Sequence, residues 1–210
     1  MNYHNSFEEE KIYHVFARAN GKEKMFIRDD DYDLFLDRLH KYVMPVADIY
    51  AFAFIPNHYH LMIKIKSYQQ LLIFAKQKKL YFHESEMWIN KLITRQFSNM
   101  QNSYCKKINY KYKRKGSLFI ERLRRLQVKS DVQFIATVFY IHKNPVHHSI
   151  TKNIRDWPFS SYHQYLSNEN LFIKNEDVLK QFGGKQHFIS FHSQNIFQKN
   201  AVEIENDDPY

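Results

Sequence analysis

The sequence predicts an α+β fold, a ferredoxin-like antiparallel sheet with helices packed on one face. Three observations predict it. Segments rich in β-branched and aromatic residues alternate with segments of helical apolar spacing, in the order strand, helix, strand, strand, helix, strand, helix. Two neighbouring strands are separated by a two-residue turn. Hydrophobic residues make up 44% of 210 residues, which is enough for one sizeable core.

The first strand and the first helix have clear boundaries. Residues 12–19 (IYHVFARA) predict a strand that ends at the turn signal Asn20-Gly21. Asp29-Asp30-Asp31 predicts the start of a helix, because acidic side chains suit the positive end of the helix dipole. We expect Pro45 to end that helix.

The clearest strands are residues 48–55 and 58–65, which are joined by Pro56-Asn57 and therefore predicted to pair antiparallel. Side chains alternate between the two faces of a strand. His58 and His60 consequently share one face of the second strand, and the apolar residues beside them share the other.

The second half of the chain repeats the pattern. Residues 68–108 predict one or two helices with a break near residues 82–85, and residues 118–128 predict one or two short strands after Gly116. Asp131 predicts the start of another helix, which we expect Pro145 to stop.

The chain divides into a main domain over residues 8–160 and a small C-terminal extension over residues 161–210. Short helical pieces are expected at residues 178–182 and 188–191, and the acidic end from residue 203 is expected to be frayed.

The composition limits the class of protein. Lys and Arg exceed Asp and Glu by nine, which favours a polyanionic partner such as nucleic acid, although a solvated basic surface would look the same. Cys105 is the single cysteine, so an internal disulfide framework and a multi-cysteine zinc site are excluded. The first residues lack an apolar stretch of signal-peptide length, and the given sequence contains no apolar run of spanning length. We expect a soluble cytoplasmic protein without a membrane partner.

His58-Tyr59-His60 is the first candidate for chemistry. Imidazoles two residues apart on a strand point the same way and can converge on one divalent ion, although two ligands do not close a site. Two ordinary surface histidines would give the same pattern.

Tyr140 and Asn144 form the second candidate. They are four residues apart and share one face of the predicted helix. A phenol can act as a nucleophile when a metal or a base assists it, and an asparagine oxygen can bind a metal. A tyrosine of the hydrophobic core would also fit.

The third candidate is a basic stretch with interleaved aromatic residues, from Tyr104 to Lys129. Cations that bind phosphates beside rings that stack on unpaired bases are typical of single-strand binding. The residues expected to contact the DNA backbone are Lys111, Lys113, Arg114, Arg122, Arg124 and Arg125.

Together these segments resemble the REP-associated tyrosine transposases, single-tyrosine members of the HUH (His-hydrophobic-His) transposase superfamily. Residues 51–63 are similar to the family's "PNHxHL" strand. Residues 140–146, followed by residues 156–162, are similar to its "YIxxNPV…WPxSSY" signature, and residues 116–122 match the intervening "G-x-L-F/W…R" element. The resemblance covers residues 10–192, and it is specific because the motifs occur in this order and spacing.

The resemblance implies that His58 and His60 hold Mg²⁺ or Mn²⁺ against the scissile phosphate. It implies that Tyr140 attacks the phosphorus, forms a 5′-phosphotyrosine link and releases a 3′-hydroxyl. Asn144 would be the third metal ligand, although related insertion-sequence transposases usually carry Gln there. Tyr59 departs mildly from the usual aliphatic middle residue.

The function that the resemblance implies is that of a metal-dependent single-stranded DNA transposase acting on hairpin-bearing repeats, as a monomer or a homodimer. Three alternatives remain. One is a catalytically idle DNA-binding protein derived from such a transposase. The others are a relative that initiates replication or conjugation, and a metal-dependent hydrolase that uses the histidine pair alone.

Overall fold

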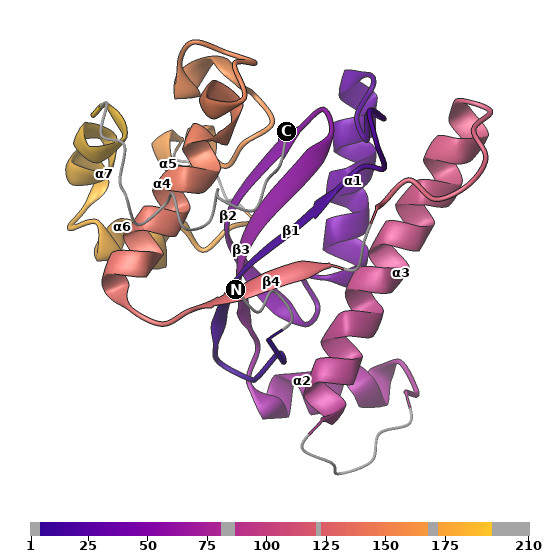
Figure 1. Cartoon of the computed structure of the whole chain (residues 1–210). Coiled ribbons are helices and arrows are strands. Elements are labelled where there is room, and N and C mark those ends of the chain that lie inside the picture. Colours follow the sequence, from indigo (N-terminus) through magenta and orange to yellow (C-terminus); the bar gives the residue numbers. More distant parts are fainter. Residues whose placement is uncertain (1–4, 81–86, 121–122, 168–171, 195–210) are drawn as a thin grey trace.

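A four-stranded antiparallel sheet lies at the centre of the molecule in the computed structural model (Figure 1). The structure describes residues 5–80, 87–120, 123–167 and 172–194. The strand order is β2-β3-β1-β4, so β3 lies between β1 and β2 as in ferredoxin-like folds. The expected α+β fold is therefore confirmed. The strands are β1 (Ile12–Arg18), β2 (Ala47–Ile55), β3 (His58–Ile65) and β4 (Arg124–Val128).

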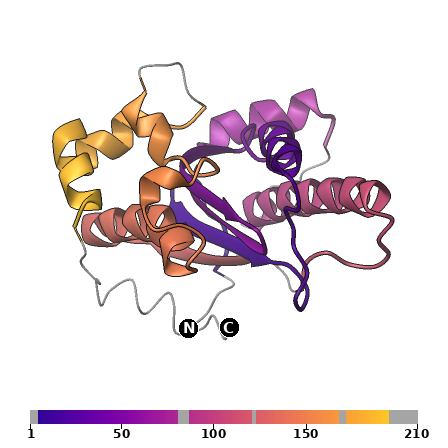
Figure 2. The same cartoon turned by 90° about the horizontal axis from the view of Figure 1, so that it is seen from above.

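Helices cover both faces of this sheet (Figure 2). α1 (Asp29–Tyr42) and α3 (Trp88–Lys111) lie on one face, where the Phe35 ring is 4.9 Å from the Tyr59 ring of β3. α4 (Asp131–His147) packs on the other face against β2 and β3. The prediction that the helices share one face is correct for α1 and α3 and wrong for α4. β2 and β3 are buried at nearly every position, which requires cover on both sides.

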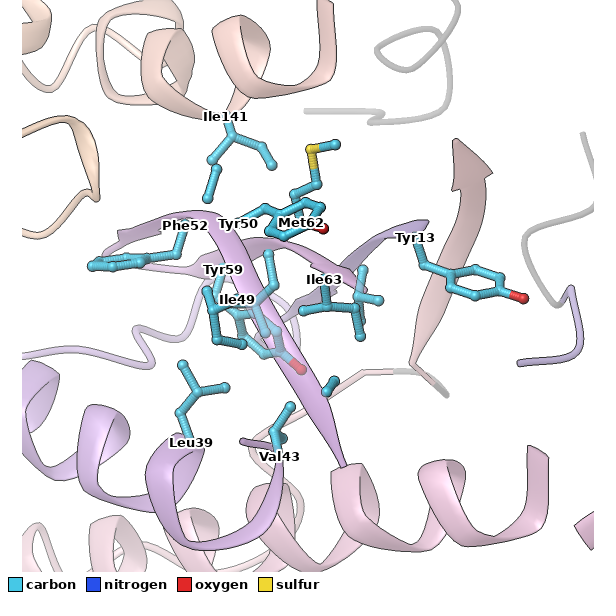
Figure 3. Close-up of a cluster of buried hydrophobic side chains, with 14 of the residues drawn as sticks. Tyr13, Leu39, Val43, Ile49, Tyr50, Phe52, Tyr59, Met62, Ile63 and Ile141 are labelled. Carbon is cyan, nitrogen blue, oxygen red and sulfur yellow. The ribbon is translucent and has the colours of Figure 1, made fainter. Parts of the chain in front are cut away.

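Figure 3 shows the two layers of the core that result. Leu39 and Val43 of α1 approach the sheet from one side, and Ile141 of α4 approaches it from the other. Along β3, Met62 points toward α4 and Ile63 points toward α1. Because side chains alternate along a strand, each residue of β3 faces either α1 or α4. His58 and His60 lie on the same face as Met62, toward α4.

The remaining helices are shorter. Ser67 caps α2 in a capping box with Gln70. The predicted break near residues 82–85 lies outside the described residues. These elements are α2 (Tyr68–Gln77), the 3₁₀ helix η1 (Ile154–Asp156), α5 (Tyr162–Leu166), α6 (Asn175–Gln181) and α7 (Lys185–His192).

The C-terminal helices lie beside α4, and the segments that precede α5 and α6 hydrogen-bond to the free edge of β2 (Figure 1). The amide of Phe54 donates to the carbonyl of Phe159, and the amide of Ser161 donates to the carbonyl of Phe52, each at 2.9 Å. The boundary expected after residue 160 therefore falls within a segment that is hydrogen-bonded to the sheet. The helical pieces expected in the extension are present as α6 and α7.

Pro145 does not stop α4, contrary to expectation, since the helix continues to His147. A proline inside a helix removes one donor. The last turn is held instead by the amide of His148, which donates to the carbonyl of Asn144 at 3.0 Å. The helix can tolerate Pro145 because only two helical residues follow it.

Candidate active site

His58 and His60 point from β3 toward α4. His58 directly follows the Pro56-Asn57 turn, and strand alternation places both rings on the same face. Their ring centroids are 5.0 Å apart and nearly perpendicular, and each residue is only 4% exposed. The pair is therefore held inside the molecule, not on its surface.

α4 places Tyr140 and Asn144 over this pair. Ser130 caps the start of the helix by accepting from the amide of Gln133. Since Tyr140 and Asn144 are one turn apart, they face the same part of the sheet. The Tyr140 ring lies 5.4 Å from the His60 ring. The four candidates from two distant segments are thus brought together within one chain.

The carboxamide of Asn144 contacts all three other candidates. Its Oδ1 is 3.1 Å from Nε2 of His58, and its Nδ2 is 3.3 Å from Nε2 of His60. The same Nδ2 donates to the hydroxyl of Tyr140 at 3.5 Å. Asn144 is fully buried, so its amide is the common point of the site.

The hydrogen-bonding around His58 fits a cation. Nε2 of His58 faces Oδ1 of Asn144, and Nδ1 faces Oδ1 of Asn57 at 2.9 Å. A neutral imidazole carries one hydrogen and can donate to only one of these acceptors. A cation between Nε2 and the Asn144 oxygen would accept a lone pair from each, and the ring hydrogen would then bond Asn57.

The donor set therefore fits a divalent metal held by His58, His60 and the Asn144 oxygen. Within the described ranges, no group of three or more His, Cys, Asp or Glu side chains could hold a metal ion. A metal bound here would need ligands beyond the two imidazoles, and the Asn144 oxygen is one that the site offers.

Burial keeps the imidazoles neutral. It lowers the pKa of His58 to about 3, with smaller contributions in the same direction from His148 and Arg18, against a hydrogen bond with Asn144 that raises it. Burial also lowers the pKa of His60 well below its usual range, with help from His58 and His14. Neutral imidazole is the form that binds a metal.

Three neighbours of the site were not singled out from the sequence. Nε2 of His14 on β1 lies 2.9 Å from Nδ1 of His60. The ring of the exposed His148, just past α4, is 4.7 Å from the ring of His58. Arg18 is the residue of β1 that lies opposite His58 in the strand register. The sequence does contain a signal for His14, because it is a histidine among the apolar residues of a predicted strand. The sequence does not show which strand lies next to it.

Two of the predicted DNA contacts are engaged in ion pairs. Nζ of Lys111 lies 2.6 Å from Asp31 and 2.7 Å from Asp30. The guanidinium of Arg114 pairs with Glu23, which raises the pKa of Arg114. These cations fasten the end of α3 to the first turn of α1 and to the loop before it, so part of their charge is already compensated.

The other predicted DNA contacts differ in exposure. Arg125 is buried, with its guanidinium 4.4 Å from the centre of the Phe7 ring. Lys113 is exposed and Arg124 is partly exposed. Arg122 lies outside the described residues.

The tyrosines of the basic stretch also differ in exposure. Tyr104 is fully buried and donates to the carbonyl of Met25 at 2.7 Å, and Tyr112 donates to Asp31 at 2.8 Å. Tyr110 is 88% exposed. Lys106 and Lys107 lie one turn before it on the same side of α3 and are also exposed. Of the three, Tyr110 is the ring available for stacking.

Comparison with solved structures supports the fold. The chain matches a REP-associated tyrosine transposase bound to a REP hairpin with a TM-score of 0.60 and 14% sequence identity, over 80% of this chain and 86% of that chain. It also matches a bacterial tRNA(His) guanylyltransferase-like protein in complex with ATP, with a TM-score of 0.42 and 12% identity, over 86% of this chain and 73% of that one. No protein-family model matches the chain. No curated protein matches it either.

At 14% identity the first of these matches establishes a shared fold and nothing about chemistry. Within the part of the chain that the structure describes, no helix combines the length and the apolar character needed to cross a membrane.

Proposed function

We propose that this protein is a metal-dependent single-stranded DNA transposase that cleaves and rejoins DNA at hairpin-bearing repeats through a 5′-phosphotyrosine intermediate. One observation carries the proposal: the amide of Asn144 contacts Tyr140, His58 and His60 at once. A nucleophile beside a set of metal donors is the arrangement that phosphoryl transfer by a tyrosine requires. The fold shared with a tyrosine transposase is compatible with the proposal.

Each side chain has a role in the proposed reaction. The Tyr140 oxygen bonds to phosphorus, the bond from phosphorus to the 3′-oxygen breaks, the phenol gives up its proton and the 3′-oxygen gains one. The amide of Asn144 donates to the Tyr140 oxygen and so stabilises its anionic form. His58, His60 and the Asn144 oxygen would hold the divalent cation, Mg²⁺ or Mn²⁺, which supplies charge stabilisation at the phosphoryl oxygens. Because the link conserves the phosphodiester energy, rejoining needs no nucleotide cofactor.

The part of the basic stretch that carries Lys113 and Arg124 lies at the same end of the sheet as the site. Ala19, which follows β1, bridges to Phe119 and donates to the carbonyl of Asn57, next to His58. The segment that carries Lys113 therefore borders the strand end that carries His58. We propose that the DNA backbone runs along this end of the sheet, past Lys113 and Arg124, with Tyr110 available to a base.

An idle DNA-binding protein is the second candidate, and one observation favours it. Tyr140 is only 6% exposed, so a phosphate must displace neighbouring atoms to reach its hydroxyl. A protein with this fold and a closed site would bind hairpin DNA without forming a covalent link.

A covalent-adduct assay decides between the two. Single-stranded hairpin oligonucleotides from inverted repeats beside the reading frame are incubated with protein and Mn²⁺ and separated under denaturing conditions. We expect an adduct with the wild type and with Tyr162→Phe, a matched change at a buried tyrosine outside the site. Tyr140→Phe should form none and still bind the DNA.

Peptide mass spectrometry should locate the nucleotide on Tyr140. An undiminished adduct with Tyr140→Phe would overturn the nucleophile assignment. Tight hairpin binding by the wild type without an adduct under Mg²⁺ or Mn²⁺ would establish the idle alternative.

A further inference from the structure

We propose that His14 is a positioning residue that holds His60 in the tautomer whose Nε2 is bare and directed at Asn144. The inference deepens the proposed function, because that nitrogen is one of the proposed metal donors. It assigns a role to a residue on β1, a strand that carries none of the candidates predicted from the sequence.

The geometry of the pair is that of a buried hydrogen bond. Nε2 of His14 lies 2.9 Å from Nδ1 of His60, and their ring centroids are 5.1 Å apart with planes inclined at 22°. His14 is 1% exposed and His60 is 4% exposed, so water does not compete for the contact. The His14 ring also meets the Tyr140 ring edge-on at 5.8 Å.

The hydrogens of this contact can be assigned from the other side of His60. Nε2 of His60 faces the Asn144 Nδ2, which carries hydrogens and no lone pair to share. With the Asn144 amide in this orientation Nε2 is the acceptor, and the single ring hydrogen of neutral His60 lies on Nδ1, from which it is donated to Nε2 of His14. An amide turned by 180° would reverse these roles, and the ¹⁵N measurement of the tautomer distinguishes the two arrangements.

His14 keeps this arrangement at a cost. Because its Nε2 accepts, its own hydrogen is on Nδ1, and that buried atom has no hydrogen-bond partner among the described residues. A buried donor without a partner is destabilising. An apolar residue would avoid the cost, so the acceptor that His14 offers to His60 is the physical reason for a histidine here. Metal-binding histidines characteristically donate their second nitrogen to such a partner.

The neighbouring Phe16 provides a matched control. Its ring lies 5.6 Å from the His60 ring, on the same strand and the same face as His14, but it offers no ring nitrogen. If His14 acts only through packing, Phe16→Leu and His14→Leu should have similar effects. If it acts through its acceptor, His14→Gln should restore what His14→Leu removes, because the glutamine oxygen reaches the position of Nε2.

The first test measures the tautomer directly by ¹⁵N NMR of the histidine rings in full-length protein without metal. We expect His60 to carry its hydrogen on Nδ1 in the wild type, in His14→Gln and in Phe16→Leu. In His14→Leu we expect the hydrogen to shift partly or wholly to Nε2. A wild-type His60 with its hydrogen on Nε2 would overturn the proposal even if His14→Leu failed to fold. An unchanged tautomer in folded His14→Leu would also overturn it.

The second test measures Mn²⁺ affinity by electron paramagnetic resonance, without DNA. We expect His14→Leu to bind Mn²⁺ about 10- to 100-fold more weakly than the wild type, the range typical of lost outer-shell partners, and His14→Gln to recover most of that loss. Equal affinities for the wild type and folded His14→Leu would refute the role, as would a wild type that binds no Mn²⁺.

These readouts separate the inference from the proposed function. A protein that shows the tautomer and the Mn²⁺ effect but forms no adduct would retain the role of His14 and lose the assignment as a transposase. A protein that forms the adduct on Tyr140 but shows neither effect would retain the assignment as a transposase and lose the role of His14.

Discussion

Oδ1 of Asn144 lies 3.1 Å from Nε2 of His58, although 86 residues separate them in the chain. His58 also faces an acceptor at its other nitrogen, Oδ1 of Asn57. A buried neutral imidazole cannot donate to both. We propose that the contact joins two neighbouring metal donors, and substitutions at Asn144 test this most directly.

Asn144→Leu removes the amide oxygen while keeping a side chain of similar size. We expect Mn²⁺ affinity to fall about 10-fold or more and DNA cleavage to fall about 100-fold or more, since the contacts to the metal and to Tyr140 are both lost. Asn144→Asp keeps an oxygen and adds negative charge, so Mn²⁺ binding should persist. Calorimetric titration and the adduct assay measure the two effects. Wild-type Mn²⁺ affinity in Asn144→Leu would exclude Asn144 as a ligand.

Chelation tests the metal requirement itself. We expect EDTA to abolish cleavage and adduct formation while hairpin binding persists, and added Mg²⁺ or Mn²⁺ to restore both activities. The double variant His58→Ala plus His60→Ala should behave like the chelated wild type at every metal concentration. Gel assays of cleavage beside binding measure this, and cleavage that continues in EDTA would contradict the metal role.

The salt dependence of DNA binding separates DNA contacts from structural cations. The logarithm of the DNA-binding constant falls linearly with the logarithm of the salt concentration. Lys113→Ala and Arg124→Ala should each make this slope less steep by about 0.7 on single-stranded DNA. Arg125→Leu should leave the slope unchanged and lower the free energy of unfolding, because its guanidinium is buried against Phe7. Fluorescence anisotropy over a salt series measures the slopes. A reduced slope for Arg125→Leu would show that it reaches DNA after all.

Asp31 predicts an acid-dependent contribution to stability. Burial raises its pKa, but hydrogen bonds from Lys111, from the amides of Arg28 and Ile27 and from Tyr112 outweigh burial, and the net pKa is lowered. A carboxyl whose folded pKa is depressed stabilises the protein above its unfolded pKa, about 3.9, and loses that contribution as pH falls through the folded value. Asp31→Asn should therefore cost about 2 kcal/mol at neutral pH and progressively less below about pH 4.

Asp30→Asn is the matched control for that experiment. Asp30 contacts the same Lys111 Nζ, but its side chain is 66% exposed, so we expect a change within about 0.5 kcal/mol. Urea unfolding of the three proteins between pH 3 and pH 7 measures both effects. A cost for Asp31→Asn that does not vary with pH would show that its charge is not the stabilising feature.

Local patterns were enough to predict most of the fold. Runs of β-branched and aromatic residues identified β2 and β3, the two-residue turn predicted their pairing, and three consecutive acidic residues marked the start of α1. The placement of α4 was missed because helical spacing defines an apolar face without saying which side of a sheet it covers. The prediction that Pro145 stops the helix is wrong because the loss of one donor is tolerable in the final turn.

For the site, spacing along one element was enough to pair His58 with His60 and Tyr140 with Asn144. Which charged residues are exposed was not visible, since Arg125 and Lys113 look alike in sequence and only packing buries one of them. The contact between His14 and His60 depends on strand order. No local pattern specifies that order.

The sequence by itself determined which side chains share a face, because the periods of strand and helix are built into the backbone. The tertiary structure alone decided that those two faces meet and that β1 lies next to β3. It also decided that Asn144 contacts both imidazoles and the phenol. The physical reason is that contacts between distant segments are selected by the burial of the whole apolar surface, a property of the folded chain and not of any short stretch of it.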